Sequence, residues 1–167
     1  MATYDGVKGQ KIIYLYRKYS ERTTKAGLNV SYVSDNGKNM SSNADTLATK
    51  DGTFSPGQTP EITISSTAYM KKGDEMLDTL KSALLNSDLL EIWEANLELP
   101  GTATGTYKGT YFQGYISSFN VSSVAEEWVT VDMDFTINGK GADGDVTVPA
   151  SIIAQADYVF ADATIAL

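Results

Sequence analysis

The sequence predicts a mainly β protein with a β-sandwich or barrel-like fold, one flanking α-helix and a long connection between two strands. Three features lead to this prediction: several segments alternate apolar and polar residues, one segment has helical spacing, and one stretch has no periodicity. The chain has 167 residues, of which 42% are hydrophobic and 20% charged, as is typical of a globular protein. We therefore expect a single domain over residues 1–167.

The expected strands are marked by period-two alternation or by a β-branched and aromatic composition. In Glu127–Ile137, apolar residues at odd positions alternate with Trp128 and polar residues at even positions, so one face of this strand should be buried. The other expected strands are Lys11–Tyr19, Leu28–Asp35, Glu61–Tyr69, Leu89–Glu94, Tyr111–Val121 and a closing strand at Asp157–Leu167.

One amphipathic helix is expected at about residues 74–87. Asp74 is its predicted N-cap, and Glu75 and Asp78 place negative charge near the end that the helix dipole favours. The apolar stripe at i, i+3, i+4, i+7 and i+8 consists of Met76, Leu77, Leu80, Ala83 and Leu84. Because such a stripe must be buried, we expect the helix to pack on a face of the sheet.

Residues 36–60 form the predicted long inter-strand loop. Fifteen of these 25 residues are Asn, Ser, Thr, Gly or Pro, and no periodicity is visible. Loops of this length within a compact domain are usually functional or disordered. The sparse apolar residues Met40, Leu47 and Phe54 could anchor the loop on a neighbouring molecule; the alternative is a flexible hairpin tip.

No catalytic, cofactor-binding or metal-binding residues are predicted, and we do not expect an enzyme. The chain has no Cys and no His, which excludes cysteine nucleophiles and histidine acid–base pairs. Residues 139–144 satisfy G-x-G-x-x-G, but the β-branched segment that follows ends at Pro149 and offers no helix N-terminus to a pyrophosphate. We therefore expect a turn there. Asp143 and Asp145 could take calcium, although turn chemistry alone explains them.

Two further patterns have a functional and a structural interpretation. Asp132 and Asp134 should lie about 7 Å apart on one strand face, which suits the carboxylates of a glycosidase, but a solvated strand face is the favoured interpretation. The chain also has ten tyrosines, which leaves a carbohydrate-binding or adhesin-type β-sandwich module as an alternative function. Tyr14, Tyr16, Tyr111 and Tyr115 are instead expected to pack between strands and at interfaces.

The net charge of −8 is unevenly distributed. Residues 1–72 contain ten basic and six acidic residues, whereas residues 73–167 contain three basic and fifteen acidic ones. Surfaces of opposite potential allow copies of a protein to dock head to tail, although an accidental distribution of solvated charge is the alternative. An acidic surface repels phosphates, which argues against ordinary DNA binding but suits a wall past which DNA slides.

No signal peptide or membrane-spanning segment is expected. Met1–Gln10 lacks an apolar core, and the apolar run Ile12–Tyr16 is far shorter than the ~20 residues that cross a bilayer. We expect a protein that is kept inside a cell, or inside something assembled there.

Several segments resemble a known family when they are taken together and in order. They are Ala48–Thr53 in the long loop, the helix, Leu90–Glu94, Tyr111–Ile116 and Phe135–Gly141. Over nearly the whole chain, this combination resembles the major tail proteins of lactococcal-type siphophages. The resemblance implies a structural virion protein, a tail tube protein that assembles into hexameric rings. These rings stack into the hollow conduit for DNA ejection.

The resemblance also implies partners, a location and a domain limit. The inner sheets of six subunits would join into one barrel, and the long loop would reach the adjacent ring. Genomic DNA would pass without specific binding, and no membrane would be involved. The implied partners are further copies of the chain, a tape measure protein, a tail terminator and baseplate or distal tail proteins. The protein would be assembled in the host bacterial cytoplasm and reside in the virion tail, without the immunoglobulin-like domain that larger relatives append.

The polar strand faces and the resemblance together give two sets of candidate residues. The residues predicted to face the lumen are Thr130, Asp132 and Asp134 on one strand and Glu61, Thr63 and Ser65 on another. The residues predicted to stack rings through the loop are Leu47, Lys50, Asp51 and Phe54.

Overall fold

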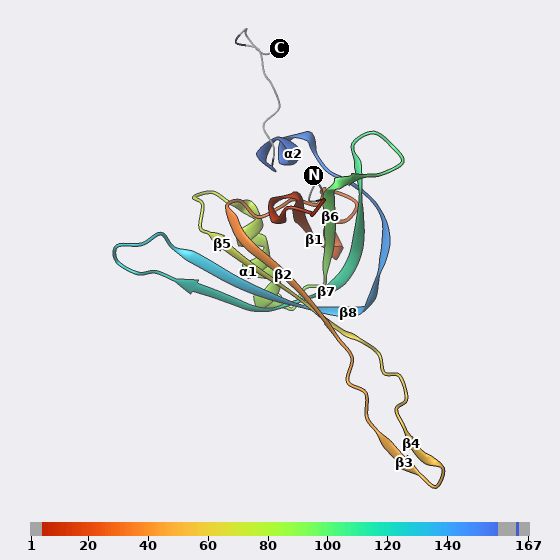
Figure 1. Ribbon diagram of the computed structural model, residues 1–167. Coiled ribbons are helices and arrows are strands. Elements are labelled where there is room, and N and C mark those ends of the chain that lie inside the picture. The colour runs from red at the N-terminus through yellow and green to blue at the C-terminus, as the bar shows by residue number, and fades with distance from the viewer. Residues whose placement is uncertain (1–4, 157–162, 164–167) are drawn as a thin grey trace.

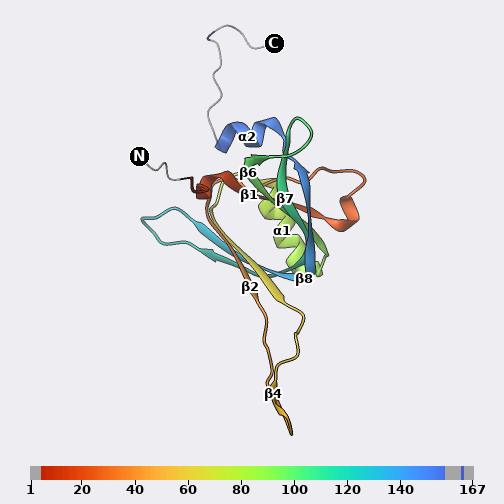
Figure 2. The same ribbon diagram turned by 45° about the vertical axis from the view of Figure 1, so that its right-hand side comes forward.

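The structure is a computed structural model that describes residues 5–156 and residue 163. Figures 1 and 2 show a curved β body from which a thin arm projects. The helices are α1 (Glu75–Asn86) and α2 (Ala150–Ala156), with short 3-10 turns at Gly9–Lys11 and Tyr19–Glu21. The strands are β1 (Ile12–Lys18), β2 (Val33–Ser41), β3 (Leu47–Thr49), β4 (Gly52–Phe54), β5 (Glu61–Tyr69), β6 (Leu90–Pro100), β7 (Thr106–Ser122) and β8 (Thr130–Thr147).

One antiparallel sheet builds the body, in the order β1-β6-β7-β8-β5-β2. The sheet curls over on itself and brings β1 close to β8. The ring of Tyr16 on β1 stacks on that of Phe135 on β8 at a centroid distance of 5.0 Å. This contact spans the two strands, β6 and β7, that separate β1 from β8 in the sheet. The mainly β, sandwich- or barrel-like prediction is therefore confirmed.

The main core lies inside this curl, between the sheet and α1. Alternate residues of β5 and β8 are buried, as their period-two patterns predict. Burial of each large apolar side chain stabilises the fold by about 1.5–3 kcal/mol. The buried residues of these two strands on the core side are Ile62, Ile64, Ser66, Ala68, Val131, Met133, Phe135 and Ile137.

Helix α1 confirms the predicted helix and its N-cap. One carboxylate oxygen of Asp74 accepts a hydrogen bond from the backbone N–H of Met76 at 3.0 Å, and the other accepts one from the N–H of Ser31 at 2.9 Å. Ser87, with a left-handed φ of 55°, ends the helix. The predicted apolar stripe packs into the core through buried Met76, Leu77, Leu80 and Ala83 and partly buried Leu84.

The strand predicted at Leu28–Asp35 is wrong in its position. Leu28 makes only an isolated bridge to Tyr16, and the chain turns at Tyr32, which has a φ of 54°. A left-handed residue interrupts an extended backbone, so β2 begins only at Val33. The alternating pattern before Tyr32 does not reveal this turn.

The turn predicted at residues 139–144 is also wrong, because β8 continues through this stretch. The pairing shifts from Gln113–Asn138 to Tyr111–Ala142, so the strand bulges where it changes direction. Gly139 and Gly141 have φ values of 72° and 75° in this bulge. A Cβ on Gly141 would lie 2.6 Å from the ring of Phe112, so this bend needs a glycine.

Helix α2 covers a second, smaller core that the sequence analysis missed. Buried Ile152 belongs to a cluster with Val146 and Val148 and with Leu15 and Ala95 of β1 and β6. The predicted closing strand at Asp157–Leu167 falls outside the described residues apart from Ala163. Among the residues that the structure describes, no helix is long and apolar enough to span a membrane.

Candidate functional site

The six residues predicted to face a lumen lie together on one surface of the sheet. Glu61, Thr63 and Ser65 of β5 are exposed on the side turned away from the core, as are Asp132 and Asp134 of β8, and Thr130 is half-buried. Paired residues of antiparallel strands project from the same face, so the strand register extends this surface to β2 and β7. We call the polar residues of this surface the acidic face: Asp35, Asn39, Ser41, Glu61, Thr63, Ser65, Thr67, Ser118, Asn120, Ser122, Thr130, Asp132, Asp134 and Thr136. The register places Gly37, Tyr69 and Tyr115 on the same side of the sheet.

The acidic face carries four carboxylates, and none of its residues is basic. The hydroxyl of Thr67 donates to Asp132 at 2.7 Å, and the hydroxyl of Ser118 donates to Asp134 at 2.9 Å. Among the described residues, no Lys or Arg forms an ion pair with any of the four carboxylates. Neutral donors therefore orient Asp132 and Asp134 without cancelling their charge.

The geometry favours the solvated-face interpretation of Asp132 and Asp134 over a glycosidase pair. Both are exposed on one strand, and each is held by a hydroxyl of a neighbouring strand. Neither residue lines either of two hollows that lie near β2 and α1. An open strand face does not shield a substrate from water as a catalytic cleft does.

The carboxylates of Asp143 and Asp145 accept hydrogen bonds from neighbouring residues of the chain. Thr110 donates to Asp143, while Lys108 and the backbone and hydroxyl of Thr102 donate to Asp145. The hydrogen bond from Lys108, with those from Thr102, lowers the pKa of Asp145. The described residues contain no cluster of three or more acidic side chains placed to hold a metal ion.

The tyrosines expected to pack between strands and at interfaces mostly make contacts inside the fold. Tyr14 and Tyr16 are buried, and this burial raises the pKa of both phenols. The hydroxyl of Tyr14 donates to Glu94, and that of Tyr111 donates to Glu91 at 2.8 Å. Of these four tyrosines, Tyr115 is the one with an exposed ring.

Glu91 of β6 is the centre of a buried polar network that includes residues of β1 and β7. Its side chain is 1% exposed and pairs with Arg17 at 2.6 Å, with Arg22 3.6 Å away. Tyr111 donates to the same carboxylate, and burial raises the pKa of this tyrosine. Arg17 also lies over the ring of Trp93. These contacts satisfy a buried charge and hold β1 to β6, so we assign the network a structural role.

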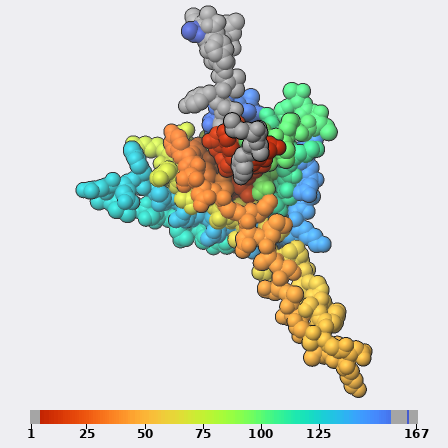
Figure 3. Space-filling model, in the orientation of Figure 1, coloured from red at the N-terminus to blue at the C-terminus, as the bar shows by residue number. Residues whose placement is uncertain are grey.

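The predicted loop at 36–60 connects two strands as expected, but it is not irregular. β2 extends to Ser41, and β3 pairs with β4 farther out, which makes residues 42–60 a hairpin that we call the arm. Polar contacts join its two sides, including Gln58 to Asp45 at 3.0 Å and Thr49 to the carbonyl of Gly52 at 2.6 Å. Figures 1 and 3 show the arm standing away from the body.

The four residues predicted to stack rings lie together at the end of the arm. Leu47 pairs with Phe54, so both side chains project from one face of the hairpin. They are 50% and 54% exposed, and Lys50 and Asp51 at the turn are exposed as well. The end of the arm therefore presents an uncovered apolar pair next to two charges.

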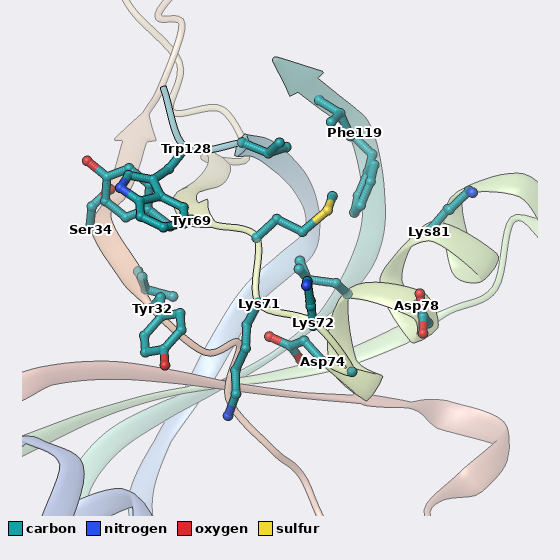
Figure 4. A pocket seen from close by; sticks show the side chains of 16 residues that line it. Tyr32, Ser34, Tyr69, Lys71, Lys72, Asp74, Asp78, Lys81, Phe119 and Trp128 are labelled. Carbon is teal, nitrogen blue, oxygen red and sulfur yellow. The ribbon is translucent and has the colours of Figure 1, made fainter. Parts of the chain in front are cut away.

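A third feature, an apolar groove, was missed by the sequence analysis. It has a volume of about 1390 Å³ and lies beside the start of α1 (Figure 4). Trp128 lines this groove and is 84% exposed. The strand predicted to begin at Glu127 begins only at Thr130, so Trp128 lies before β8. The one sequence feature that could have indicated this groove was Trp128, a tryptophan at a position where the alternating strand pattern expects a polar residue. We define the apolar groove by Tyr32, Tyr69, Met70, Phe119, Val121 and Trp128.

Comparison with known proteins relates this fold to phage tails. A tail protein of Staphylococcus phage phiMR25 is 28% identical over 157 residues, which cover 91% of this chain and 80% of the relative. A chain of the SPP1 tail tube has a TM-score of 0.74 at 17% identity, over 89% of this chain and 86% of that one. A chain from the tail of an empty gene transfer agent particle, refined with C6 symmetry, has a TM-score of 0.63 at 7% identity, over 82% and 98% of the two chains.

The family assignment rests on the sequence itself. Residues 6–143, most of the chain, match the family described as phage tail tube protein. This match confirms the expected family, and with it a structural role in a phage tail. The chain belongs to the phage tail tube protein family.

Proposed function

We propose that copies of this tail tube protein close into rings of six that stack into a hollow tube, with the acidic face lining the lumen. The observation that carries this proposal is the acidic face itself, with four carboxylates and no basic residue. A duplex that carries one negative charge per about 1.7 Å is repelled by such a surface, so it slides through without sticking.

Ring closure is supported by the free edges of the sheet on either side of the acidic face. β2 is an outer strand, and the pairing of β6 with β7 stops at Gly114, which leaves residues 115–122 of β7 without a strand on that side in the described sheet. Exposed edges readily pair with other chains. When β2 of one copy pairs with residues 115–122 of the next, the acidic faces join into one continuous inner wall.

Stacking of the rings is assigned to the arm. Leu47 and Phe54 are exposed at its end, and apolar side chains presented in this way are typical of an interface with another molecule. In this proposal a tape measure protein, a terminator and baseplate or distal tail proteins complete the tail. Genomic DNA passes through it without specific binding, and assembly takes place in the bacterial cytoplasm.

The first test is an image of the assembled protein. Concentrated protein should form filaments of uniform width, and a cryo-EM map of them should place Asp132 and Asp134 on the lumen. A map that places these residues on the outer surface would overturn the assignment of the wall. A protein that stays monomeric at every concentration would overturn the tube itself.

The second test changes the charge of the wall. Asp132→Lys with Asp134→Lys should leave tube assembly intact but slow DNA ejection, because the new ammonium groups bind passing phosphates. Glu126→Lys with Glu127→Lys makes the same charge change at exposed residues between β7 and β8, outside the acidic face, and should eject DNA normally. Equal ejection rates for the two variants would contradict the proposed orientation.

A further inference from the structure

The apolar groove and the arm lie at opposite ends of the same two strands. β2 begins at Val33, directly after Tyr32 of the groove, and runs to Ser41, where the arm starts. β5 begins at Glu61, where the arm returns, and ends at Tyr69 of the groove. With about 3.3 Å per residue, the nine residues from Ser42 to Lys50 reach about 30 Å beyond the end of β2.

This arrangement makes the chain asymmetric along its strands, with a projection at one end and a hollow at the other. Two different surfaces that meet between copies form a heterologous contact, and repetition of that contact builds an open filament. When copies follow one another along the direction of β2 and β5, the arm of one points at the groove of the next.

The two surfaces also match in chemistry. In Figure 4, Tyr69 and Trp128 lie on one side of the groove and Phe119 and Lys81 on the other. Met70, 44% exposed, and Val121, 51% exposed, complete a lining that nothing in the described chain covers. The arm presents the apolar pair Leu47 and Phe54, and both side chains are exposed.

Charged side chains lie beside both apolar surfaces, with Lys72, Lys81 and Asp78 at the groove and Lys50 and Asp51 at the turn of the arm. Lys72 and Lys81 line the groove, and neither forms an ion pair with a described residue. Asp74 is used as the helix cap, and Lys71 lies over the ring of Tyr32 at 5.7 Å. Asp51, at the turn of the arm, likewise has no ion-pair partner among the described residues.

We propose that the apolar groove receives the end of the arm from a second copy of this chain in the adjacent ring. Leu47 and Phe54 enter between Trp128 and Phe119, and Asp51 lies near Lys72. The proposal rests on the stacked rings described above and names the surface on which stacking occurs. In this proposal the arm enters the groove from the adjacent ring, beside the edges of β2 and β7 that close each ring.

Because the chain has no cysteine, a disulfide can report this contact directly. Phe54→Cys with Met70→Cys, assembled and then oxidised, should give a reducible ladder that extends well beyond six subunits on a denaturing gel. Phe54→Cys with Leu85→Cys is the matched control, since Leu85 is 73% exposed on α1 and does not line the groove. This control should stay uncross-linked.

The possible results separate the inference from the proposed function. Tubes without a Phe54–Met70 cross-link, or with a ladder that stops at one ring, would overturn the groove as the inter-ring seat and leave the tube intact. Failure of the unmodified protein to form tubes would overturn both.

A second measurement does not depend on cysteine chemistry. Met70→Ser with Trp128→Ser changes two exposed side chains and should raise the protein concentration needed for tube growth at least tenfold, as should Leu47→Ser with Phe54→Ser. Leu85→Ser should leave this concentration unchanged. A groove variant that elongates like the unmodified protein would overturn the proposal, and so would equal loss of growth in the Leu85 control.

Discussion

The body and the arm are continuous, because β2 and β5 of the body lead into the arm, but different interactions hold them. Within the body, every second residue of β5 and of β8 as far as Ile137 is buried against the core. In the arm, every residue from 42 to 55 is exposed, and hydrogen bonds join its two sides. A two-stranded hairpin without a buried face is marginally stable in water. The body therefore folds by itself, whereas the arm has the properties of a segment that is completed by another molecule.

Hydrogen exchange should give the largest contrast between the two regions. Amides of β5 and β8 should exchange only by global unfolding, which costs about 5–15 kcal/mol in a typical protein and slows exchange by more than a thousandfold. Amides of β3 and β4 should exchange nearly as fast as an unfolded peptide in the unassembled chain and become protected in tubes. Strong protection of the arm before assembly would contradict this comparison.

Two phenylalanines allow the same contrast to be measured as stability. Phe135 is fully buried and stacks on Tyr16, so Phe135→Ala should lower the free energy of unfolding by about 3–5 kcal/mol. Phe54 is 54% exposed at the end of the arm, so Phe54→Ala should change the free energy of unfolding by no more than about 0.5 kcal/mol. The same substitution should impair assembly. Urea unfolding of both variants is the measurement. A large loss from Phe54→Ala would show that the arm supports the body.

The difference between the regions also explains what the sequence could predict. Glu61–Tyr69 was predicted with the bounds of β5, because one buried face imposes strict alternation on a strand. Helix α1 was predictable for the same reason, with a capping Asp74 at its start. β3 and β4 have three exposed residues each, so burial imposes no pattern on them and the arm looked irregular.

The remaining errors arise where long-range geometry decides the local structure. The bend at Gly139–Gly141 is set by how β8 must cross Phe112 of β7, which no local pattern contains. The part of the acidic face on β5 and β8 was predictable, because its residues alternate with the core residues of those strands. Its part on β2 was not, because β2 has no such alternation and residues 36–41 were expected to belong to the loop. The apolar groove was not, because Tyr32, Phe119 and Trp128 come from segments far apart in the chain.

The glycine bend offers a smaller, local test of how the body is shaped. Gly141→Ala places a methyl group against the ring of Phe112 at a φ of 75°, and should lower the free energy of unfolding by about 1–3 kcal/mol. Gly144→Ala is the matched control in the same strand, with nothing within 4 Å of the added Cβ and no positive φ. The control should be neutral or slightly stabilising. Equal effects on thermal unfolding would show that the bend does not depend on Gly141.

The smallest effect concerns a charge at the surface of the body. Lys108 and Thr102 lower the pKa of Asp145 in the folded chain, so its carboxylate favours folding at pH values above the unfolded pKa, near 4. That contribution should disappear as the pH falls from this value toward the lower pKa of the folded state. Asp145→Asn and Lys108→Ala should therefore both reduce the loss of stability on acidification, and added salt should weaken the difference because the pair is exposed to solvent. NMR titration of Asp145 checks the cause, since an ordinary carboxyl pKa would remove the basis for the effect.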